Sequence, residues 1–258
     1  MLFRSRRLIA SRFRDRCAFI AGDAAHIWVP YAGYGMNAGI ADATNLSWML
    51  AAHLNGWAPA SILDAYEAER LPITSQVSRF AMSHAEAEIR RRGAVPDAIE
   101  DAGAEGERVR QETGRLTYEI NVQQYACEGL NFGSYYDRSP IIAYDGGEPP
   151  AYTMNSYTPS TVPGCRTPHL WCADSASLYD AMGPEFTLLR FDPAADAMPL
   201  VRAAGERKLP LRVVDVAAPP AIAREGALVL SRPDQHVAWR GHSAPADPLV
   251  LIDRIRGA

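Results

Sequence analysis

The stretch that decides the fold is CAFIAGDAAHIWVPYAGYGMNAGIADATNL, which occupies residues 17–46. Its apolar start, Cys17 to Ala21, is short and does not alternate, as is typical of a strand buried on both faces. A loop from Pro30 to Gly35 follows, and a helical period then runs as far as the stop signal Asn55-Gly56. Near one face of that helix recur the apolar residues Met36, Ile40, Ala43, Leu50 and Leu54. The stretch therefore predicts a strand, a glycine-containing loop and a helix.

The loop and its two borders carry the chemistry. The Asp23 carboxylate, at the exit of the predicted strand, can accept hydrogen bonds from ligand hydroxyls. Gly33 and Gly35 let backbone amides approach a flat ligand, and the helix after Gly35 directs its positive end toward a negative charge. Asp23 can equally be a turn or cap residue, with the glycines as turn formers. On the residues alone, an anion-tolerant ligand site and a purely structural turn are both open.

Three groups of residues resemble one family. The stretch from Gly22 to Leu46 resembles the second flavin-binding motif of the FAD-dependent aromatic hydroxylases, the single-component monooxygenases of the para-hydroxybenzoate hydroxylase type. Its matching residues are Gly22-Asp23-Ala24-Ala25-His26, Pro30, Gly33, Gly35, Asn37, Asp42-Ala43 and Asn45-Leu46. The segment that follows in the family is matched by Tyr66, Glu67, Glu69-Arg70 and Pro72. The end of the thioredoxin-like C-terminal domain of the phenol-hydroxylase-like branch is matched by Ser231-Arg232-Pro233-Asp234, Val237, Trp239 and Arg240.

The resemblance implies an FAD-dependent monooxygenase that hydroxylates a small aromatic or phenolic substrate with O2 and uses NAD(P)H as reductant. It implies that Asp23 contacts the ribityl or pyrophosphate part of FAD. Pro30, the implied catalytic position, would lie beside the isoalloxazine with its carbonyl near the substrate. The backbone of residues 35–37 would sit against the flavin N1–C2=O edge, where a helix N-terminus stabilises the anionic reduced flavin. The implied cofactor-binding residues are Gly22, Asp23, Pro30, Gly33, Gly35, Met36 and Asn37.

The sequence departs from the family pattern in two ways. Val29 stands where the motif often has a second proline, and Ala32 where it often has glycine, but both keep the loop small or apolar. The larger departure is the Rossmann G-x-G-x-x-G motif for the ADP half of FAD, which occurs nowhere in this sequence. We therefore expect a truncated product, a fragment, or one part of a split enzyme without its N-terminal half. The competing hypothesis is a catalytically silent fragment or an interaction module that self-associates through its thioredoxin-like domain.

Composition and pattern along the chain predict an α/β protein with two domains. Residues 1–128 are assigned to the C-terminal part of an FAD-binding domain with long helices, 129–160 to a Gly- and Pro-rich connection, and 161–258 to a thioredoxin-like domain. The last domain has a β-α-β-β-α order, with strands at 187–191, 211–216, 227–231 and 237–240 and helices near 174–182, 194–206 and 246–256. Other predicted features are a helix start at 61–64, a kink or interruption at Pro72, an exposed broken helical region over 86–115 and a strand at 140–144.

The overall composition excludes several classes of protein. At 258 residues, with 48% hydrophobic and 22% charged residues, the chain can bury a core and is neither disordered nor fibrous. Its 26 basic and 30 acidic residues leave a net charge of −4, which argues against a nucleic-acid binder. No apolar run approaches the roughly 18 residues of a membrane span, and the 4 cysteines are too few for a disulfide scaffold. We therefore expect a cytoplasmic protein with reduced thiols, whose partner is either a second copy of the chain or the N-terminal half.

Two smaller signals have competing interpretations. The arginines between Arg4 and Arg16 suit a transit peptide or a nucleic-acid arm, but a short solvated surface segment is the simpler interpretation. A zinc site can be assembled from Cys165, His169, Cys172 and His236. These residues lack C-x-x-C spacing, so we expect neither a metal site nor disulfide exchange. Of the other histidines, His26 is expected to be packed, and the surface is predicted for His53, His84 and His242.

Overall fold

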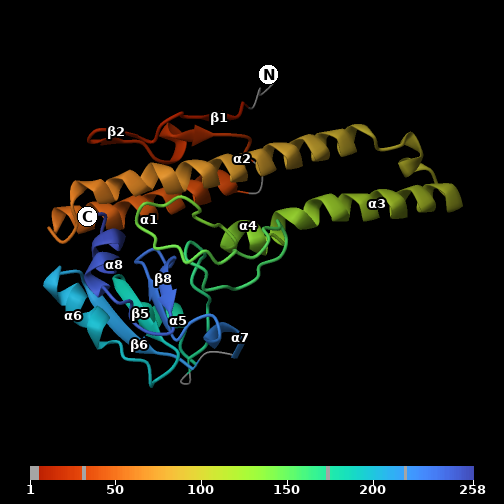
Figure 1. Ribbon diagram of the computed structural model, residues 1–258. Helices are drawn as coiled ribbons and strands as arrows, with labels where there is room; N and C mark the ends of the chain where they lie inside the picture. Colours follow the sequence, from red (N-terminus) through yellow and green to blue (C-terminus); the bar gives the residue numbers. More distant parts are fainter. Residues whose placement is uncertain (1–5, 31–32, 173–174, 218–219) are drawn as a thin grey trace.

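The computed structural model of the chain describes residues 6–30, 33–172, 175–217 and 220–258. In Figure 1 short N-terminal strands lie at the top, the long helices α1 (Tyr34–Leu54) and α2 (Asp64–Gly93) lie below them, and the C-terminal sheet with its helices lies at the bottom. This mixture of helices and strands confirms the α/β class. Arg4 of the N-terminal arginine group, the motif departure at Ala32 and the first residue of the helix predicted near 174–182 lie outside the described residues.

The predicted strand at 17–21 is shorter and more exposed than expected. Only β3 (Ala18–Phe19) forms there, and it pairs antiparallel with β2 (Arg14–Asp15). Similarly, β1 (Leu8–Ile9) pairs antiparallel with β4 (His26–Ile27). Each of these sheets has two strands in the described part of the chain, so β3 has a neighbour on one side only. The expectation of a strand buried on both faces is therefore wrong, and β3 is exposed at its first residue and half-buried at its second.

Helix α1 forms as predicted but turns a different face toward the protein. Met36, Ile40 and Leu54 are 71%, 56% and 80% exposed, so the apolar stripe seen in the sequence is not the buried face. The residues that α1 buries are Tyr34, Ala38, Asp42, Asn45, Trp48, Met49 and Ala52. Two of these are polar, and each is hydrogen-bonded to a charged side chain of α2. Burial of polar side chains is acceptable where partners satisfy them, and hydropathy does not detect such partners.

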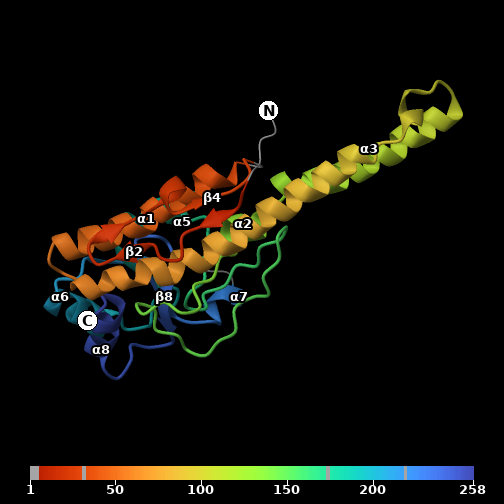
Figure 2. The same ribbon diagram turned by 90° about the horizontal axis from the view of Figure 1, so that it is seen from above.

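Helix α2 continues through Pro72, so the predicted interruption there is wrong. A short 3-10 turn, η2 (Ala60–Leu63), precedes it. The break predicted within 86–115 is confirmed between the end of α2 and α3 (Ala104–Tyr125), with η3 (Asp97–Glu100) inside it. Helices α2 and α3 run side by side and project from the body as an arm (Figure 2). No helix within the described ranges has both the length and the hydropathy to span a membrane.

The C-terminal part is a small sheet flanked by short helices. Its strands are β5 (Phe186–Arg190), β6 (Leu211–Asp215), β7 (Leu228–Ser231) and β8 (Val237–Gly241). The remaining helices are α4 (Glu128–Phe132), α5 (Leu178–Met182), α6 (Met198–Glu206), α7 (Pro220–Ala223) and α8 (Pro248–Ile255). The sheet order is β6-β5-β7-β8, in which β5 and β6 are parallel and the other pairs antiparallel.

All four predicted strands form. In chain order the elements are β5, α6, β6, α7, β7, β8 and α8, so the predicted β-α-β-β-α order is wrong and the observed order is β-α-β-α-β-β-α. Helix α7 is an addition that the sequence did not predict. The strand predicted at 140–144 does not form, although the Ala143 amide donates to the Ala238 carbonyl of β8 at 2.8 Å. This hydrogen bond holds the segment beside the edge strand β8, but a strand requires a series of such bonds.

One hydrophobic core is shared by the N-terminal helices and the C-terminal sheet. Trp48 of α1 and Tyr66 of α2 belong to the same buried cluster as Phe186 and Leu188 of β5. The rings of Trp48 and Trp57 meet the Phe186 ring edge-on, with centroids 5.8 and 6.0 Å away. The domain limits at residues 128 and 160 remain a prediction, because this core crosses them.

A buried ion pair fixes the sheet against α2. Arg232, directly after β7, has a fully buried side chain that donates to both carboxylate oxygens of Glu69, at 2.5 and 2.8 Å. It also donates to Asp234 at 3.0 Å, and its guanidinium carbon lies 5.1 and 5.4 Å from the rings of Trp48 and Tyr136. In the sequence, Arg232 and Asp234 stood out only as part of the resemblance to the C-terminal domain. The structure adds a charged connection between α2 and the β7–β8 turn.

Replacement of Glu69 by Ala should lower the free energy of unfolding by about 3–5 kcal/mol, because removing one partner of a buried pair leaves a poorly compensated charge. The measurement is urea unfolding followed by circular dichroism. Asp215→Ala is the matched control, since it breaks the exposed Arg190–Asp215 pair and should cost at most about 1 kcal/mol. Equal losses in the two variants would contradict the structural role of Glu69.

Candidate functional site

The turn η1 (Gly22–Ala24) is held against α1 by a buried carboxylate. Asp42 of α1 is 0% exposed, and its Oδ2 accepts a hydrogen bond from the Gly22 amide at 3.2 Å and lies 2.6 Å from His26 Nε2. Its Oδ1 accepts from Arg70 Nε of α2 at 2.9 Å. Burial opposes ionisation of Asp42, but the hydrogen bond to His26 and the Arg70 charge outweigh it and lower the pKa. One ionised side chain therefore joins η1, α1 and α2.

Two glycines let η1 approach α1 closely. Gly22 has φ of +57°, a left-handed conformation that side chains disfavour. A Cβ added to Gly39 would lie 3.2 Å from the Gly22 Cα, closer than side chains normally pack. Asp23, the residue that follows Gly22, is exposed. The turn thus presents the Asp23 carboxylate to solvent beside the helix.

The N-terminus of α1 is free of competing negative charge. Gly33, with φ of +70°, precedes the first helical residue and makes no side-chain cap, and no acidic residue lies in the first turn. Met36 and Asn37 are exposed, and the Asn37 side chain donates to the Gly33 carbonyl at 2.9 Å. The first amides of a 21-residue helix and its positive dipole end can therefore receive an anion.

The predicted site residues fall on two adjoining elements. Gly22 and Asp23 form η1, while Gly33 and the residues after it begin α1. Pro30 is exposed, and the two positions after it, 31 and 32, lie outside the described residues. The sequence missed the part played by Asp42 and Arg70. The available signal was their place in the two family motifs, in Asp42-Ala43 and in Glu69-Arg70.

The histidines divide between packed and exposed positions. His26 is 2% exposed and its ring stacks on Trp28 with centroids 4.9 Å apart, which confirms the packed assignment. His242 is exposed as predicted, and His53 is half-buried. His84 is 5% exposed, so its predicted surface position is wrong. It lies on the inner side of α2, where its ring is 5.9 Å from that of Phe80.

The cysteines show no arrangement suited to redox or metal chemistry. In the described ranges no group of three or more His, Cys, Asp or Glu side chains is close enough to hold a metal ion. All of the cysteines are free thiols. Burial raises the pKa of the Cys165 thiol to about 11, so it is protonated and poorly nucleophilic near neutral pH.

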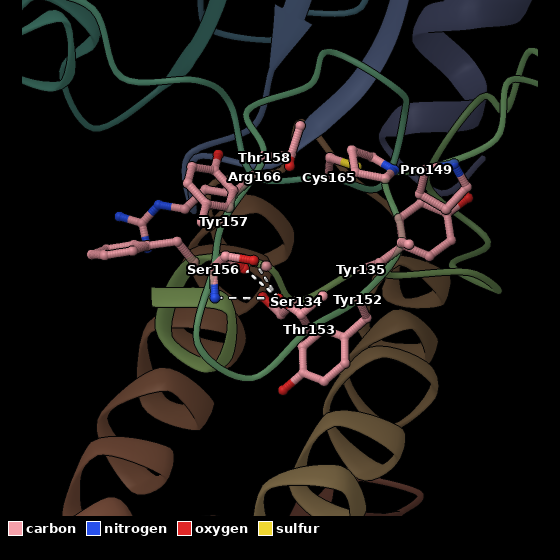
Figure 3. Close-up of a pocket in the computed structure, with 14 residues that line it drawn as sticks. Ser134, Tyr135, Pro149, Tyr152, Thr153, Ser156, Tyr157, Thr158, Cys165 and Arg166 are labelled. Atoms are coloured by element: carbon pink, nitrogen blue, oxygen red, sulfur yellow. Dashed lines mark hydrogen bonds between the residues drawn. The ribbon is translucent and has the colours of Figure 1, made fainter. Parts of the chain in front are cut away.

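A small hollow lies in the connection after α4. Figure 3 shows the labelled residues around it, among them Tyr135, Tyr152 and Cys165, together with the hydrogen bonds between Thr153 and Ser156. Its volume is about 30 Å³. A cavity needs roughly 10–15 Å³ to hold one water molecule, so this hollow accommodates water but no aromatic ring.

Two protein families match the chain on either side of the connection. Residues 2–81 match the FAD binding domain family, and residues 160–256 match the family of the aromatic-ring hydroxylase C-terminal domain. The chain thus joins a region that matches an FAD binding domain to one that matches the C-terminal domain of aromatic-ring hydroxylases. The first match covers η1 and the whole of α1.

The proteins that this chain resembles include FAD-dependent monooxygenases. The chain is 35% identical to FAD-dependent monooxygenase opdD of Penicillium oxalicum, over 87% of this chain and 44% of the relative. It is 31% identical to phenol 2-monooxygenase of a Pseudomonas species, over 92% of this chain and 44% of the relative. The structure of the rebeccamycin biosynthetic enzyme RebC with reduced flavin is 38% identical, has a TM-score of 0.85 and is matched over 97% of this chain and 47% of that one. The chain thus spans less than half the length of these proteins.

Replacement of Asp42 by Asn should lower the free energy of unfolding at neutral pH by about 3 kcal/mol or more, because the buried Arg70 loses its carboxylate. The folded pKa of Asp42 is depressed, so its stabilisation is complete above the unfolded pKa of about 3.9 and is lost as the pH falls through the folded pKa. The difference between wild type and variant should therefore narrow in acid. Urea unfolding across this pH range measures it, with Asp64→Asn as the exposed control. A pH-independent difference would contradict an ionised Asp42.

Proposed function

We propose that the chain holds the isoalloxazine end of FAD in a monooxygenase, and that the complete enzyme hydroxylates a small aromatic or phenolic substrate with O2 and NAD(P)H. Bound FAD, reduced by NAD(P)H, would supply the electrons for O2 activation. The proposal is carried by two features: the exposed Asp23 carboxylate in η1, the turn that Asp42 fixes to α1 through the Gly22 amide, and the N-terminus of α1, which has no side-chain cap. The names of relatives such as phenol 2-monooxygenase support the class of substrate.

The residues present fit this cofactor. The Asp23 carboxylate would accept hydrogen bonds from ribityl hydroxyls. The amides of residues 35–37 would hold negative charge on the flavin N1–C2=O edge, and a Cβ placed on Gly35 would meet nothing within 4 Å, so the approach is open. Pro30 would direct its carbonyl toward the substrate. Gly22 and Gly33 supply the left-handed turns that bring these groups together.

Several exposed apolar side chains support the proposal that a second polypeptide packs against this chain. Leu8 and Ile27, paired across β1 and β4, are 53% and 42% exposed, and Met36 and Ile40 are also exposed. Relatives carry a further length of chain greater than this one. We propose that a polypeptide with the Rossmann fold covers this surface, with self-association as the alternative, and that the complex works in the cytoplasm.

The isolated chain should bind FAD weakly, because the adenosine end of FAD has no Rossmann site here and the two parts lose the effective concentration of a single chain. Purified chain should therefore be colourless. Adding the separately produced N-terminal half of a relative such as phenol 2-monooxygenase should restore flavin absorbance. Stoichiometric FAD in the isolated chain would sink the split-site proposal and favour a self-sufficient protein.

Asp23→Ala should weaken FAD retention in the reconstituted enzyme by about tenfold or more, since a charge-assisted hydrogen bond contributes roughly 1.5–3 kcal/mol. Flavin absorbance after dialysis measures the retention. Asp97→Ala, in η3 on the projecting arm, is the control and should keep its flavin. Equal retention in wild type and Asp23→Ala would refute the assigned role of this carboxylate.

A further inference from the structure

Tyr34, the first residue of α1, is buried at the start of the helix. It is 7% exposed and directly follows Gly33, the residue with φ of +70°. Among residues 33–37, all of which the structure describes, Tyr34 alone is buried, whereas Met36 and Asn37 are exposed. The direction in which the first amides of α1 face therefore depends on how the Tyr34 side chain is held.

The Tyr34 hydroxyl is bonded to the junction between α3 and α4. It donates to Cys127 Sγ at 2.9 Å and lies 3.3 Å from the Gln124 carbonyl oxygen. The buried thiol is held in turn, since it donates to the Gln124 carbonyl at 3.4 Å and accepts from Asn131 Nδ2 at 3.4 Å. Burial raises the pKa of Tyr34, and the hydrogen bond to Cys127 raises it further, so the phenol stays protonated and remains a donor.

The same cluster supports the chain before the loop. Trp28, which precedes Pro30, packs against the buried cluster that includes Tyr34 and Cys127. The Tyr34 ring also meets the Phe80 ring of α2 edge-on, with centroids 5.8 Å apart. The segments on either side of the loop are therefore held by one cluster, which joins α2 to the α3–α4 junction.

We propose that Tyr34 is a positioning residue for the reduced flavin, and that Cys127 is the acceptor through which it acts. The inference rests on the proposed function, in which the amides of residues 35–37 hold negative charge on the flavin N1–C2=O edge. The favourable field of a helix N-terminus is confined to its first turn, so a displaced first turn stabilises the charge less. Donors stabilise a developing charge best when they are fixed in advance, and the Tyr34–Cys127 hydrogen bond fixes these donors.

Tyr34→Phe tests the connection in the full chain without flavin, because it keeps the ring and removes only the hydroxyl. The amides of residues 38–41 donate to the first turn of α1, and their exchange with deuterium should become about fivefold faster on loss of one hydrogen bond. Cys127→Ala removes the acceptor and should have a similar local effect, and combining the two changes should add little. Tyr179→Phe is the matched control, since it removes a hydroxyl that donates to the Thr167 carbonyl at 2.6 Å and should leave these amides unchanged.

The reduction potential of bound FAD is the measurement that loss of a purely structural contact would not change. It is made on the complex of this chain with the separately produced N-terminal half. Tyr34→Phe should lower the preference of the complex for reduced over oxidised flavin about threefold, the size of a modest helix-dipole contribution, and so make the potential more negative. Tyr179→Phe should keep the wild-type potential.

Circular dichroism establishes that each variant is folded. The positioning role is overturned by unchanged exchange at residues 38–41 in Tyr34→Phe, by additive effects of Tyr34→Phe and Cys127→Ala, or by an unchanged potential in a Tyr34→Phe complex that retains flavin. Loss of flavin from the Tyr34→Phe complex alone, with the Tyr179→Phe complex retaining it, supports the role. A wild-type complex that binds no flavin would instead overturn the proposed function on which the inference rests.

Discussion

The buried ion pair between Arg232 and Glu69 is the constraint on which the arrangement of the two parts depends. Both side chains are removed from water, and neither charge is tolerated there without the other. Burial opposes the charge on Arg232, but Asp234 and Glu69 outweigh it and keep its pKa well above the ordinary value. These contacts form only when the β7–β8 turn lies against α2. The buried ion pair and the shared apolar core therefore both hold the sheet against α2.

The turn η1 is built on the same principle. Asp42 is buried and is compensated by Arg70 on α2, and its remaining oxygen holds the amide of Gly22 and the ring of His26. The position of Asp23 at the surface is thus set by the interior carboxylate of Asp42, which binds the neighbouring Gly22 amide. The position of η1 therefore depends on the hydrogen bonds between the buried polar side chains of α1 and α2.

Helix α1 takes part in both connections. Asn45 donates to Glu69 at 2.7 Å and also to Asp234 at 3.2 Å, so one side chain of α1 joins α2 to the β7–β8 turn. On the same helix, Asp42 binds Arg70 of α2 and the Gly22 amide of η1. A change in the position of α1 would therefore affect both the docked sheet and η1.

The sequence alone determined the glycine turn before α1, the resemblance to the aromatic hydroxylases, and the positions of the four strands of the C-terminal sheet, because these depend on local residue types and spacing. It did not determine which face of α1 is buried. Met36 and Ile40 look like core residues by hydropathy, yet Asp42 and Asn45 are inside because their partners stand on α2. Burial of a polar side chain depends on a partner supplied by another segment, and only the tertiary structure brings that partner into contact.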